Sequence, residues 1–323
     1  MKIGILGAGG IAKKMADTIY AIEGVESYAI GAREYEKAKK FADENGFTKA
    51  YGSYEALVSD PEIDLIYIAT PHSHHYEHMK MCLNHKKNVL CEKAFTVNAE
   101  QAIEVIALAE RKKLFLAEAL WTRYMPMRQT INEVIKSGMI GEVTSIVANL
   151  GYAIDHIPRI QNSALAGGAL LDLSVYVINF ASMILGNDIK KICATATMTD
   201  KGVDSQDSIV ITYPDGKMAM FYTTTLSSTD REGVINGRNG YIKIDNINNY
   251  EKIRVFNNEQ ELIQTIHAPE QITGYEYEIL AAKKALEEGK TECIEMPHQE
   301  TIHMMEVLDG IRAQWGMKYT CEW

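Results

Sequence analysis

The chain has 323 residues, of which 46% are hydrophobic and 24% are charged, and its formal net charge is −10. At about 150 residues per domain, this length predicts two domains with ordinary hydrophobic cores. The acidic balance argues against a nucleic-acid partner held through its phosphates. The sequence shows no apolar run of about 18 residues and no signal peptide, so we expect no membrane partner and a cytoplasmic location.

The first part of the chain alternates apolar, strand-like segments with helical segments. Gly24 and Gly46 follow two of the expected helices and end them. This alternation is typical of βαβ units and predicts an α/β Rossmann dinucleotide-binding domain with a parallel sheet over residues 1–120. The expected strands are 2–6, 27–30, 64–69, 88–91 and 115–118, and the expected helices are 11–22, 34–45, 54–58, 75–85 and 99–113.

The pattern changes near residue 120, where we place the boundary to a second domain over residues 121–323. Residues 208–213 and 217–222 are strand-like and flank Pro214-Asp215-Gly216, in which proline presets a turn and glycine takes the left-handed position. This half is expected to be α+β, with a large, mostly antiparallel open sheet. Its expected helices are 128–136, 170–185, 275–288 and 299–315.

A glycine-rich turn follows the first expected strand. Its residues, Gly7-Ala8-Gly9-Gly10-Ile11-Ala12, form the pattern G-x-G-x-x-A where the first helix opens. The first glycine makes the tight turn, the second lets a pyrophosphate approach the backbone, and the small third position lets helix and strand pack closely. We therefore expect Gly7, Gly9, Gly10, Ile11 and Ala12 to bind a nicotinamide dinucleotide at the helix N-terminus.

The end of the second strand bears on the choice between NADP and NAD. An NAD enzyme usually has an acidic residue there for the ribose 2′-hydroxyl. This chain instead has Gly31-Ala32-Arg33, and a guanidinium pairs well with a 2′-phosphate. The sequence therefore predicts NADP as the preferred cofactor, with NAD possible. The alternative is that Arg33 is a solvated residue and that Glu34 binds the ribose.

Two further strand ends are expected at the edge of the sheet where open α/β sheets bind ligands. The strand at 64–69 ends in Ala69-Thr70-Pro71-His72, and the strand at 88–91 leads into Glu92-Lys93-Ala94. A lysine in such a place can hydrogen-bond a substrate hydroxyl and favour its alkoxide-like transition state. The alternative is an ordinary surface lysine. We expect Ala69, Thr70, Pro71, His72, Glu92 and Lys93 to contact the cofactor.

Histidines are dense just after the strand at 64–69. His74 and His78 have helical i, i+4 spacing, but a zinc site needs three or four convergent ligands and hydride transfer needs none. We therefore expect no metal. His72 and His75 are expected to line the nicotinamide side of the cofactor site.

These segments, together with the run Gly167-Gly168-Ala169-Leu170-Leu171-Asp172-Leu173-Ser174-Val175-Tyr176, resemble the Gfo/Idh/MocA oxidoreductases over essentially the whole chain. The string Glu118-Ala119-Leu120-Trp121-Thr122-Arg123-Tyr124 is similar to the branch that contains trans-dihydrodiol dehydrogenases and NADP-dependent D-xylose 1-dehydrogenases. The resemblance implies a catalytic set of Lys93, Asp172 and Tyr176.

The resemblance also implies roles for these three residues. Tyr176 would be the general base for oxidation and the general acid for reduction. Since a free tyrosine titrates near about pH 10, Lys93 would supply the neighbouring cation and bind the reacting oxygen, while Asp172 orients the substrate or the lysine. The family usually has proline after this lysine, whereas Ala94 stands here, so the local turn is expected to differ.

The expected function is NADP-dependent transfer of hydride between the nicotinamide and a hydroxyl-bearing carbon of a sugar, polyol or cyclic diol. A carbonyl or keto-sugar reductase and a non-catalytic NADP-binding regulatory protein are the alternatives. The resemblance implies a homodimer formed through the C-terminal sheet. The expected substrate contacts are Trp121, Arg123, Tyr124, His156 and Arg159.

Overall fold

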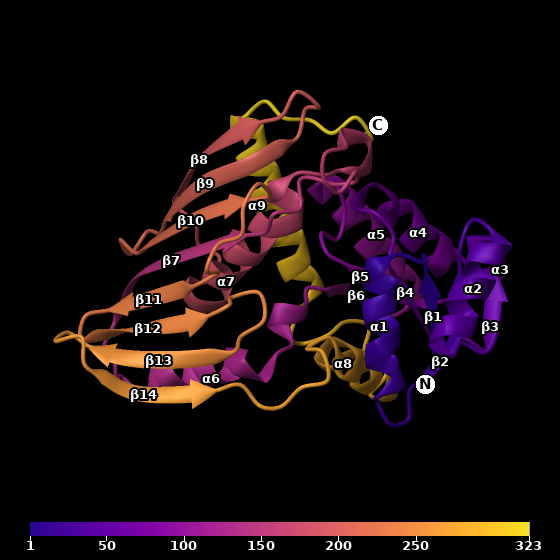
Figure 1. The fold of residues 1–323 in the computed structure, drawn as a ribbon, viewed down its shortest axis with the longest axis horizontal. Coiled ribbons are helices and arrows are strands. Elements are labelled where there is room, and N and C mark those ends of the chain that lie inside the picture. The colour runs from indigo at the N-terminus through magenta and orange to yellow at the C-terminus, as the bar shows by residue number, and fades with distance from the viewer. Residues whose placement is uncertain (323) are drawn as a thin grey trace. The chain divides into compact units, whose positions relative to one another are not determined.

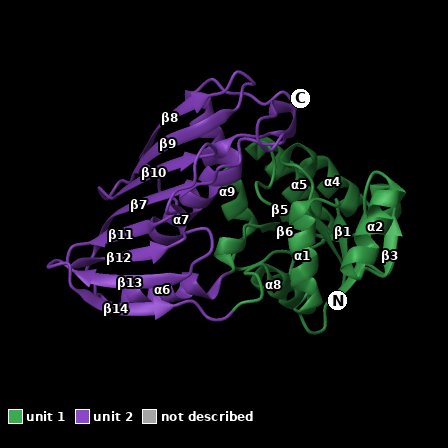
Figure 2. Cartoon of the chain, in the orientation of Figure 1, with its two compact units in different colours: residues 1–124, 271–305 green, residues 125–270, 306–323 purple. Residues whose placement is uncertain are grey.

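A computed structural model describes residues 1–322 and divides them into two compact units (Figure 2). Unit 1 comprises Met1–Tyr124 and Gln271–Met305, and unit 2 comprises Met125–Glu270 and the residues from Glu306 onward. From the sequence, one boundary is expected near residue 120, with all later residues in the second domain. In the structure, Gln271–Met305 belongs to unit 1 instead.

Direct contacts explain why this late segment belongs to unit 1. The Thr18 and Thr273 hydroxyls lie 2.6 Å apart, and the Leu116 N–H donates to the Thr291 carbonyl at 3.0 Å. A ring nitrogen of His298 lies 2.8 Å from the Leu116 carbonyl oxygen. Such long-range pairings leave no trace in local periodicity.

Unit 1 is built on a parallel sheet whose strands follow the order β3-β2-β1-β4-β5-β6 within the described residues (Figure 1). The central strands are continuous apolar runs that are buried on both faces, as parallel strands covered by helices require. The strands are β1 (Lys2–Leu6), β2 (Glu26–Gly31), β3 (Lys49–Tyr51), β4 (Leu65–Ile68), β5 (Asn88–Glu92) and β6 (Leu116–Ala119). The helices are α1 (Gly10–Tyr20), α2 (Tyr35–Asn45), α3 (Tyr54–Val58), α4 (His72–Asn84), α5 (Ala99–Lys112) and α8 (Glu276–Glu287), with a short 3₁₀ turn at Trp121–Arg123.

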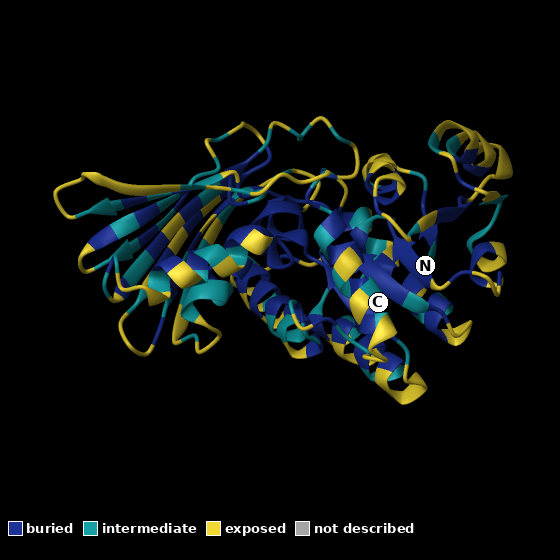
Figure 3. Cartoon of the chain, turned by 90° about the horizontal axis from the view of Figure 1, so that it is seen from below, coloured by how far each residue is buried: buried dark blue, intermediate teal, exposed yellow. Residues whose placement is uncertain are grey.

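Unit 2 contains the second sheet, with strand order β14-β13-β12-β11-β7-β10-β9-β8 among the described residues (Figure 1). Its neighbours are antiparallel except for the parallel pair β7 and β10. Buried and exposed residues alternate along several of these strands (Figure 3), as in a sheet with one covered face. The strands are β7 (Val143–Gly151), β8 (Lys191–Met198), β9 (Asp204–Thr212), β10 (Met218–Thr224), β11 (Gly233–Gly237), β12 (Gly240–Asp245), β13 (Lys252–Asn257) and β14 (Leu262–His267).

The helices of unit 2 are α6 (Pro126–Lys136) and α7 (Val175–Leu185), and α9 (His298–Gln314) is divided between the two units. The predicted hairpin is confirmed: Thr212 pairs with Met218, and Gly216 has φ +87°. Both parts of the expected fold class, a Rossmann domain and a mostly antiparallel sheet, are therefore confirmed.

One stretch of unit 2 differs from the expectation that the chain has no long apolar segment. The stretch Ser163–Leu185 begins with a 3₁₀ turn at Ser163–Leu165 and becomes helical from Ala169. By length and composition it is apolar enough to span a membrane, and 78% of its most apolar window is buried inside the protein. That burial is typical of a core helix. Within this stretch, Leu170–Ser174 forms a π-helical turn, η3, which leads directly into α7.

Candidate active site

The glycine-rich turn brings the ends of β1, β2 and β4 together. Gly7 has φ +106°, and its N–H donates to the Gly31 carbonyl at 2.9 Å. A Cβ at Gly7 would lie 3.0 Å from the Ala69 carbonyl oxygen and 3.0 Å from Thr70 Cγ2. Glycine is therefore required both by the left-handed backbone and by the close approach of the loop after β4.

The N-terminus of α1 suits an anionic ligand. Gly9 is its cap residue, and among the described residues no side chain caps this end and no acidic residue occupies its first turn. A Cβ at Gly9 or Gly10 would meet nothing within 4 Å, so the space beside the turn is open, whereas Ala12 is fully buried against the sheet. Ile11 is half-buried between these environments. The first-turn N–H groups can therefore receive a pyrophosphate.

Arg33 follows β2 and is exposed. Its positive charge is felt nearby: burial first, and Arg33 second, lower the pKa of His74. Glu34 is the cap residue of α2 and is also exposed. A guanidinium at this point supplies a cation where a 2′-phosphate would need one.

The loop after β4 runs from Ala69 to Pro71, and His72, which is buried, begins α4. His75, which is expected to line the cofactor site, is fully buried, and its ring nitrogens lie 2.7 Å from the Thr70 carbonyl oxygen and 2.8 Å from that of Ala94. Burial lowers the pKa of His75 to about 4, so near pH 7 the ring is neutral and its single N–H can donate to only one of these two carbonyl oxygens. The ring lies between the loop after β4 and the loop after β5.

Lys93 is half-buried at the end of β5, and the peptide between Lys93 and Ala94 is cis. Alanine in place of proline predicts a different turn here, because cis peptides are rare outside proline, yet the structure has the cis form. The Lys93 N–H donates to Glu92 Oε2 at 3.2 Å, and the buried Tyr67 hydroxyl donates to the other Glu92 oxygen. The Glu92 carboxylate therefore holds the Lys93 backbone and is itself held by Tyr67.

Two buried carboxyls near Glu92 were not identified from the sequence as candidate site residues. Burial raises the pKa of Glu118 to about 7, and burial together with the charge of Glu92 raises that of Glu278 well above its ordinary value. No oxygen of Glu278 has a hydrogen-bond partner among the described residues. A glutamate on a helix such as α8 is usually exposed, so the burial of Glu278 is visible only in the fold.

Residues expected to touch substrate near the end of β6 are mostly engaged internally. Arg123 forms an ion pair with Glu300, and the Tyr124 hydroxyl donates to the Glu118 carbonyl at 2.7 Å. Trp121 stacks on Tyr275 with ring centroids 4.2 Å apart. Its indole N–H has no hydrogen-bond partner in the described part of the chain.

Asp172 and Tyr176 lie in unit 2 and Lys93 lies in unit 1. Asp172 is in the π-helical turn and Tyr176 in the first turn of α7, and both are buried. Asp172 accepts two hydrogen bonds from the half-exposed Arg159, at 3.2 and 3.3 Å. Arg159, expected to touch substrate, is therefore a partner of Asp172, while His156 is exposed before it. Such π-helical turns are frequent at functional sites.

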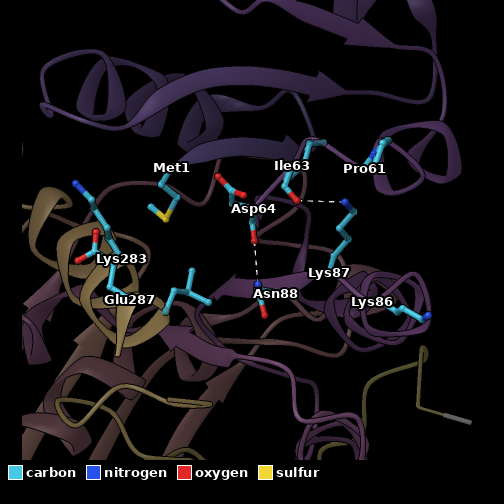
Figure 4. Close-up of a pocket in the computed structure, with 10 residues that line it drawn as sticks. Met1, Pro61, Ile63, Asp64, Lys86, Lys87, Asn88, Lys283 and Glu287 are labelled. Atoms are coloured by element: carbon cyan, nitrogen blue, oxygen red, sulfur yellow. Dashed lines mark hydrogen bonds between the residues drawn. The ribbon is translucent and has the colours of Figure 1, made fainter. Parts of the chain in front are cut away.

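Unit 1 also contains a cavity of about 540 Å³, which is separate from the predicted site residues. Asp64, Lys87 and Asn88 line it beside the amino ends of β4 and β5, and no predicted site residue does (Figure 4). The Lys87 ammonium is held by the carbonyl oxygen of Ile63 at 3.1 Å. Within residues 1–322, no group of three His, Cys, Asp or Glu side chains is arranged to hold a metal ion.

Comparison with known proteins places these features in a family. Residues 1–119 match the model of an oxidoreductase family with an NAD-binding Rossmann fold, and residues 128–243 match the GFO/IDH/MocA C-terminal domain. The chain is 32% identical to the trans-1,2-dihydrobenzene-1,2-diol dehydrogenase of Xenopus tropicalis, covering 98% of this chain and 99% of the relative. The enzyme of that name from Homo sapiens is 32% identical over 90% of this chain and 89% of its own length.

Solved structures share the fold across almost the full length. A 3-ketoreductase from Actinomadura kijaniata, in complex with NADP and TDP-benzene, superposes with a TM-score of 0.89 at 22% identity and covers 97% of both chains. A levoglucosan dehydrogenase in complex with NADH superposes with a TM-score of 0.86 at 18% identity, covering 98% of this chain and 97% of its own.

Proposed function

Because the chain belongs to the Gfo/Idh/MocA oxidoreductase family, we propose that it is an NADP-preferring dehydrogenase acting on a cyclic diol or a sugar. The observation that carries this proposal is the similarity, over 98% of the chain, to enzymes named trans-1,2-dihydrobenzene-1,2-diol dehydrogenase. The proposed reaction converts a hydroxyl-bearing carbon to a carbonyl.

In the proposed mechanism a nicotinamide dinucleotide, held by the glycine-rich turn and Arg33, would supply the hydride acceptor for oxidation and the hydride donor for reduction. The Tyr176 phenolate takes the proton of the substrate hydroxyl during oxidation, and the Tyr176 phenol gives a proton back during reduction. Lys93 donates a hydrogen bond to the same oxygen and stabilises the negative charge that develops there. Asp172, which is held by Arg159 at 3.2 and 3.3 Å, orients the substrate.

A coupled absorbance assay tests the function. NADP or NAD is offered with trans-dihydrodiols, aldoses and inositols, and the appearance of reduced cofactor is followed at pH 8. Reduction of NADP by one class names the substrate class. In the reverse assay, NADPH is offered with keto sugars, and oxidation there but not in the forward panel would favour the carbonyl-reductase alternative. Tight NADPH binding with no turnover in either direction contradicts the enzymatic proposal and favours a regulatory protein.

We expect replacement of Arg33 with alanine to weaken NADP binding by about tenfold or more, because it removes a guanidinium that pairs with the 2′-phosphate. NAD, which lacks this phosphate, should bind as before. Fluorescence titration with both cofactors measures the two dissociation constants. Exchange of the neighbouring Glu34 for glutamine is the matched control and should leave NADP affinity unchanged. An unaltered NADP to NAD ratio in the Arg33 variant contradicts the assignment.

A homodimer through the second sheet is proposed on the apolar side chains that its open face exposes. Met218, Met220 and Tyr222 alternate with buried residues along β10, and Val147 is the neighbour of Met220 on β7. Apolar side chains in a contiguous exposed group mark an interaction surface.

Met220→Asp is expected to shift the protein from dimer to monomer, because a dimer would bury the new carboxylate without a partner. Light scattering at micromolar concentration measures the mass. Ile294→Asp, at an exposed apolar position in unit 1, is the control and should leave the dimer intact. A monomeric wild type refutes the proposed dimer.

A further inference from the structure

Two carboxylates from β9 lie directly against the π-helical turn that carries Asp172. Asp204 is 1% exposed and Asp207 is 2% exposed. One oxygen of Asp204 accepts the Leu170 N–H at 2.7 Å, and one oxygen of Asp207 accepts the Ser174 hydroxyl at 2.6 Å. Leu170 and Ser174 are the first and last residues of the turn, so the two carboxylates hold both of its ends.

A β-bulge allows both carboxylates to face the same side. Residues three apart on a regular strand point to opposite faces. Here Thr197 pairs with Gln206 and Met198 pairs with Asp204, so Ser205 is an extra residue on β9. The bulge redirects Asp204 toward the turn, to the side that Asp207 already faces.

The paired glycines of the sequence motif make this contact possible. A Cβ at Gly168 would lie 2.2 Å from an Asp204 oxygen, and Gly168 has φ +101°. A Cβ at Gly167 would lie 2.4 Å from the carbonyl oxygen of Arg159, the partner of Asp172. The Gly167-Gly168 pair therefore lets the backbone reach both the buried carboxylate and the segment that carries Arg159.

Neither carboxylate forms an ion pair with a basic side chain in the described residues, and each has one oxygen without a hydrogen-bond partner. Burial, and for Asp204 also the charge of Asp207, raises the pKa of both groups. Tyr319 faces Asp204 from the C-terminal segment, and burial keeps its own pKa well above the ordinary value, so its phenol is neutral. The two carboxyls are therefore coupled through their charges, and burial favours the neutral form of each.

We propose that Asp204 and Asp207 are positioning residues that act as one buried pair and hold Asp172 and Tyr176 in their working orientation. The pair fixes the turn at Leu170 and Ser174, two residues before and two residues after Asp172. Thr223 of the neighbouring strand β10 also donates to Asp207, at 3.0 Å, and so helps to fix the position of this carboxylate. The catalytic consequence rests on the proposed function, whereas the structural consequence does not.

Alanine and asparagine variants separate positioning from general destabilisation. Asp207→Ala removes the acceptor for Ser174, and we expect kcat to fall about 10²-fold, as for a displacement of about 1 Å at a catalytic group. Asp207→Asn keeps a carbonyl acceptor and should recover most of kcat. NADP affinity should be the same in both variants, because the residues expected to bind NADP lie in unit 1. Ser208→Ala, at an exposed position on the same strand, is the control.

Hydrogen exchange gives a readout that needs no substrate. In Asp207→Ala and Asp204→Ala, amides of residues 169–176 should exchange at least tenfold faster than in the wild type, while those of β12 and β13 stay unchanged. If the wild type turns over nothing in the substrate panel, the proposed function fails and exchange still decides the positioning role. Unchanged exchange in both alanine variants overturns the positioning role, whatever the activity.

The pH dependence keeps the proposal testable even where an alanine variant does not fold. A carboxyl whose pKa is raised on folding contributes stability that is complete below its unfolded value of about 4 and is lost as the pH rises through the raised value. Protection of residues 169–176, corrected for intrinsic exchange, should therefore fall from pH 5 to pH 9 in the wild type. Asp204→Asn should flatten this fall, and an equally steep fall in that variant contradicts the coupling of the two carboxyls.

Discussion

Lys93→Ala is expected to lower kcat for NADP-dependent oxidation by about 10²–10³-fold, the usual loss when one donor to a developing oxyanion is removed. Lys93 follows β5, at the sheet edge where the loop after β4 and the glycine turn also lie. Its backbone is held by Glu92, which accepts the Lys93 N–H at 3.2 Å. Removal of the Lys93 side chain therefore leaves this backbone hydrogen bond in place. Steady-state kinetics with the best substrate of the panel measure the fall in kcat.

Two comparisons make this result specific to the ammonium group of Lys93. Lys112→Ala, at an exposed position in the last turn of α5, should leave kcat unchanged. Lys93→Arg keeps the charge but replaces a compact ammonium with a planar fork, so it should recover only part of the activity. Turnover of the alanine variant within about threefold of the wild type would falsify the role given to Lys93.

Much of unit 1 could be predicted from sequence because its signals are local. A strand, a glycine turn and a helix follow one another within residues 2–20, and the close approach of Gly7 to Ala69 is the reason that glycine is needed. The predicted strands at 64–69 and 88–91 appear as β4 and β5. Strand β3 was not predicted, since it has only 3 residues and so is too short to show a period.

What escaped prediction depends on contacts between distant segments. The pairing of Arg159 with Asp172 joins a loop to a helical turn, and nothing in the spacing distinguishes it from a substrate contact. The bulge at Ser205 that turns Asp204 inward is visible only in the register between β8 and β9. His75 follows a strand end, but its full burial between the loops after β4 and β5 cannot be predicted from that position.

The same reasoning explains why the π-helical turn was read as ordinary helix. The spacing of Asp172 and Tyr176 fits one helix face, and both residues do lie in one continuous helical stretch. Its first five residues, however, are held at their two ends by Asp204 and Asp207 from β9. Local sequence can indicate that a segment is helical, whereas the tertiary hydrogen bonds at the two ends of this turn are visible only in the fold.

Tyr176→Phe is expected to lower kcat by about 10²–10⁴-fold, the range that general acid–base catalysis contributes. The change removes one hydroxyl from a side chain that is 6% exposed, so the aromatic packing of α7 is retained. KM should change little, because the hydroxyl acts on the proton that moves in the transition state rather than on ground-state binding. The rate of the residual reaction should also lose the rise with pH that a general base gives to the wild type.

The comparison that decides the matter is with Tyr213→Phe, which removes the hydroxyl of another buried tyrosine in unit 2. That variant should keep kcat, KM and the pH profile of the wild type. If both phenylalanine variants lose activity equally, the loss reflects packing of unit 2 and Tyr176 has no chemical role. If Tyr176→Phe alone is inactive but binds NADPH normally, the proton is transferred through the Tyr176 hydroxyl group. The role left to Lys93 is then to bind the substrate oxygen that loses this proton.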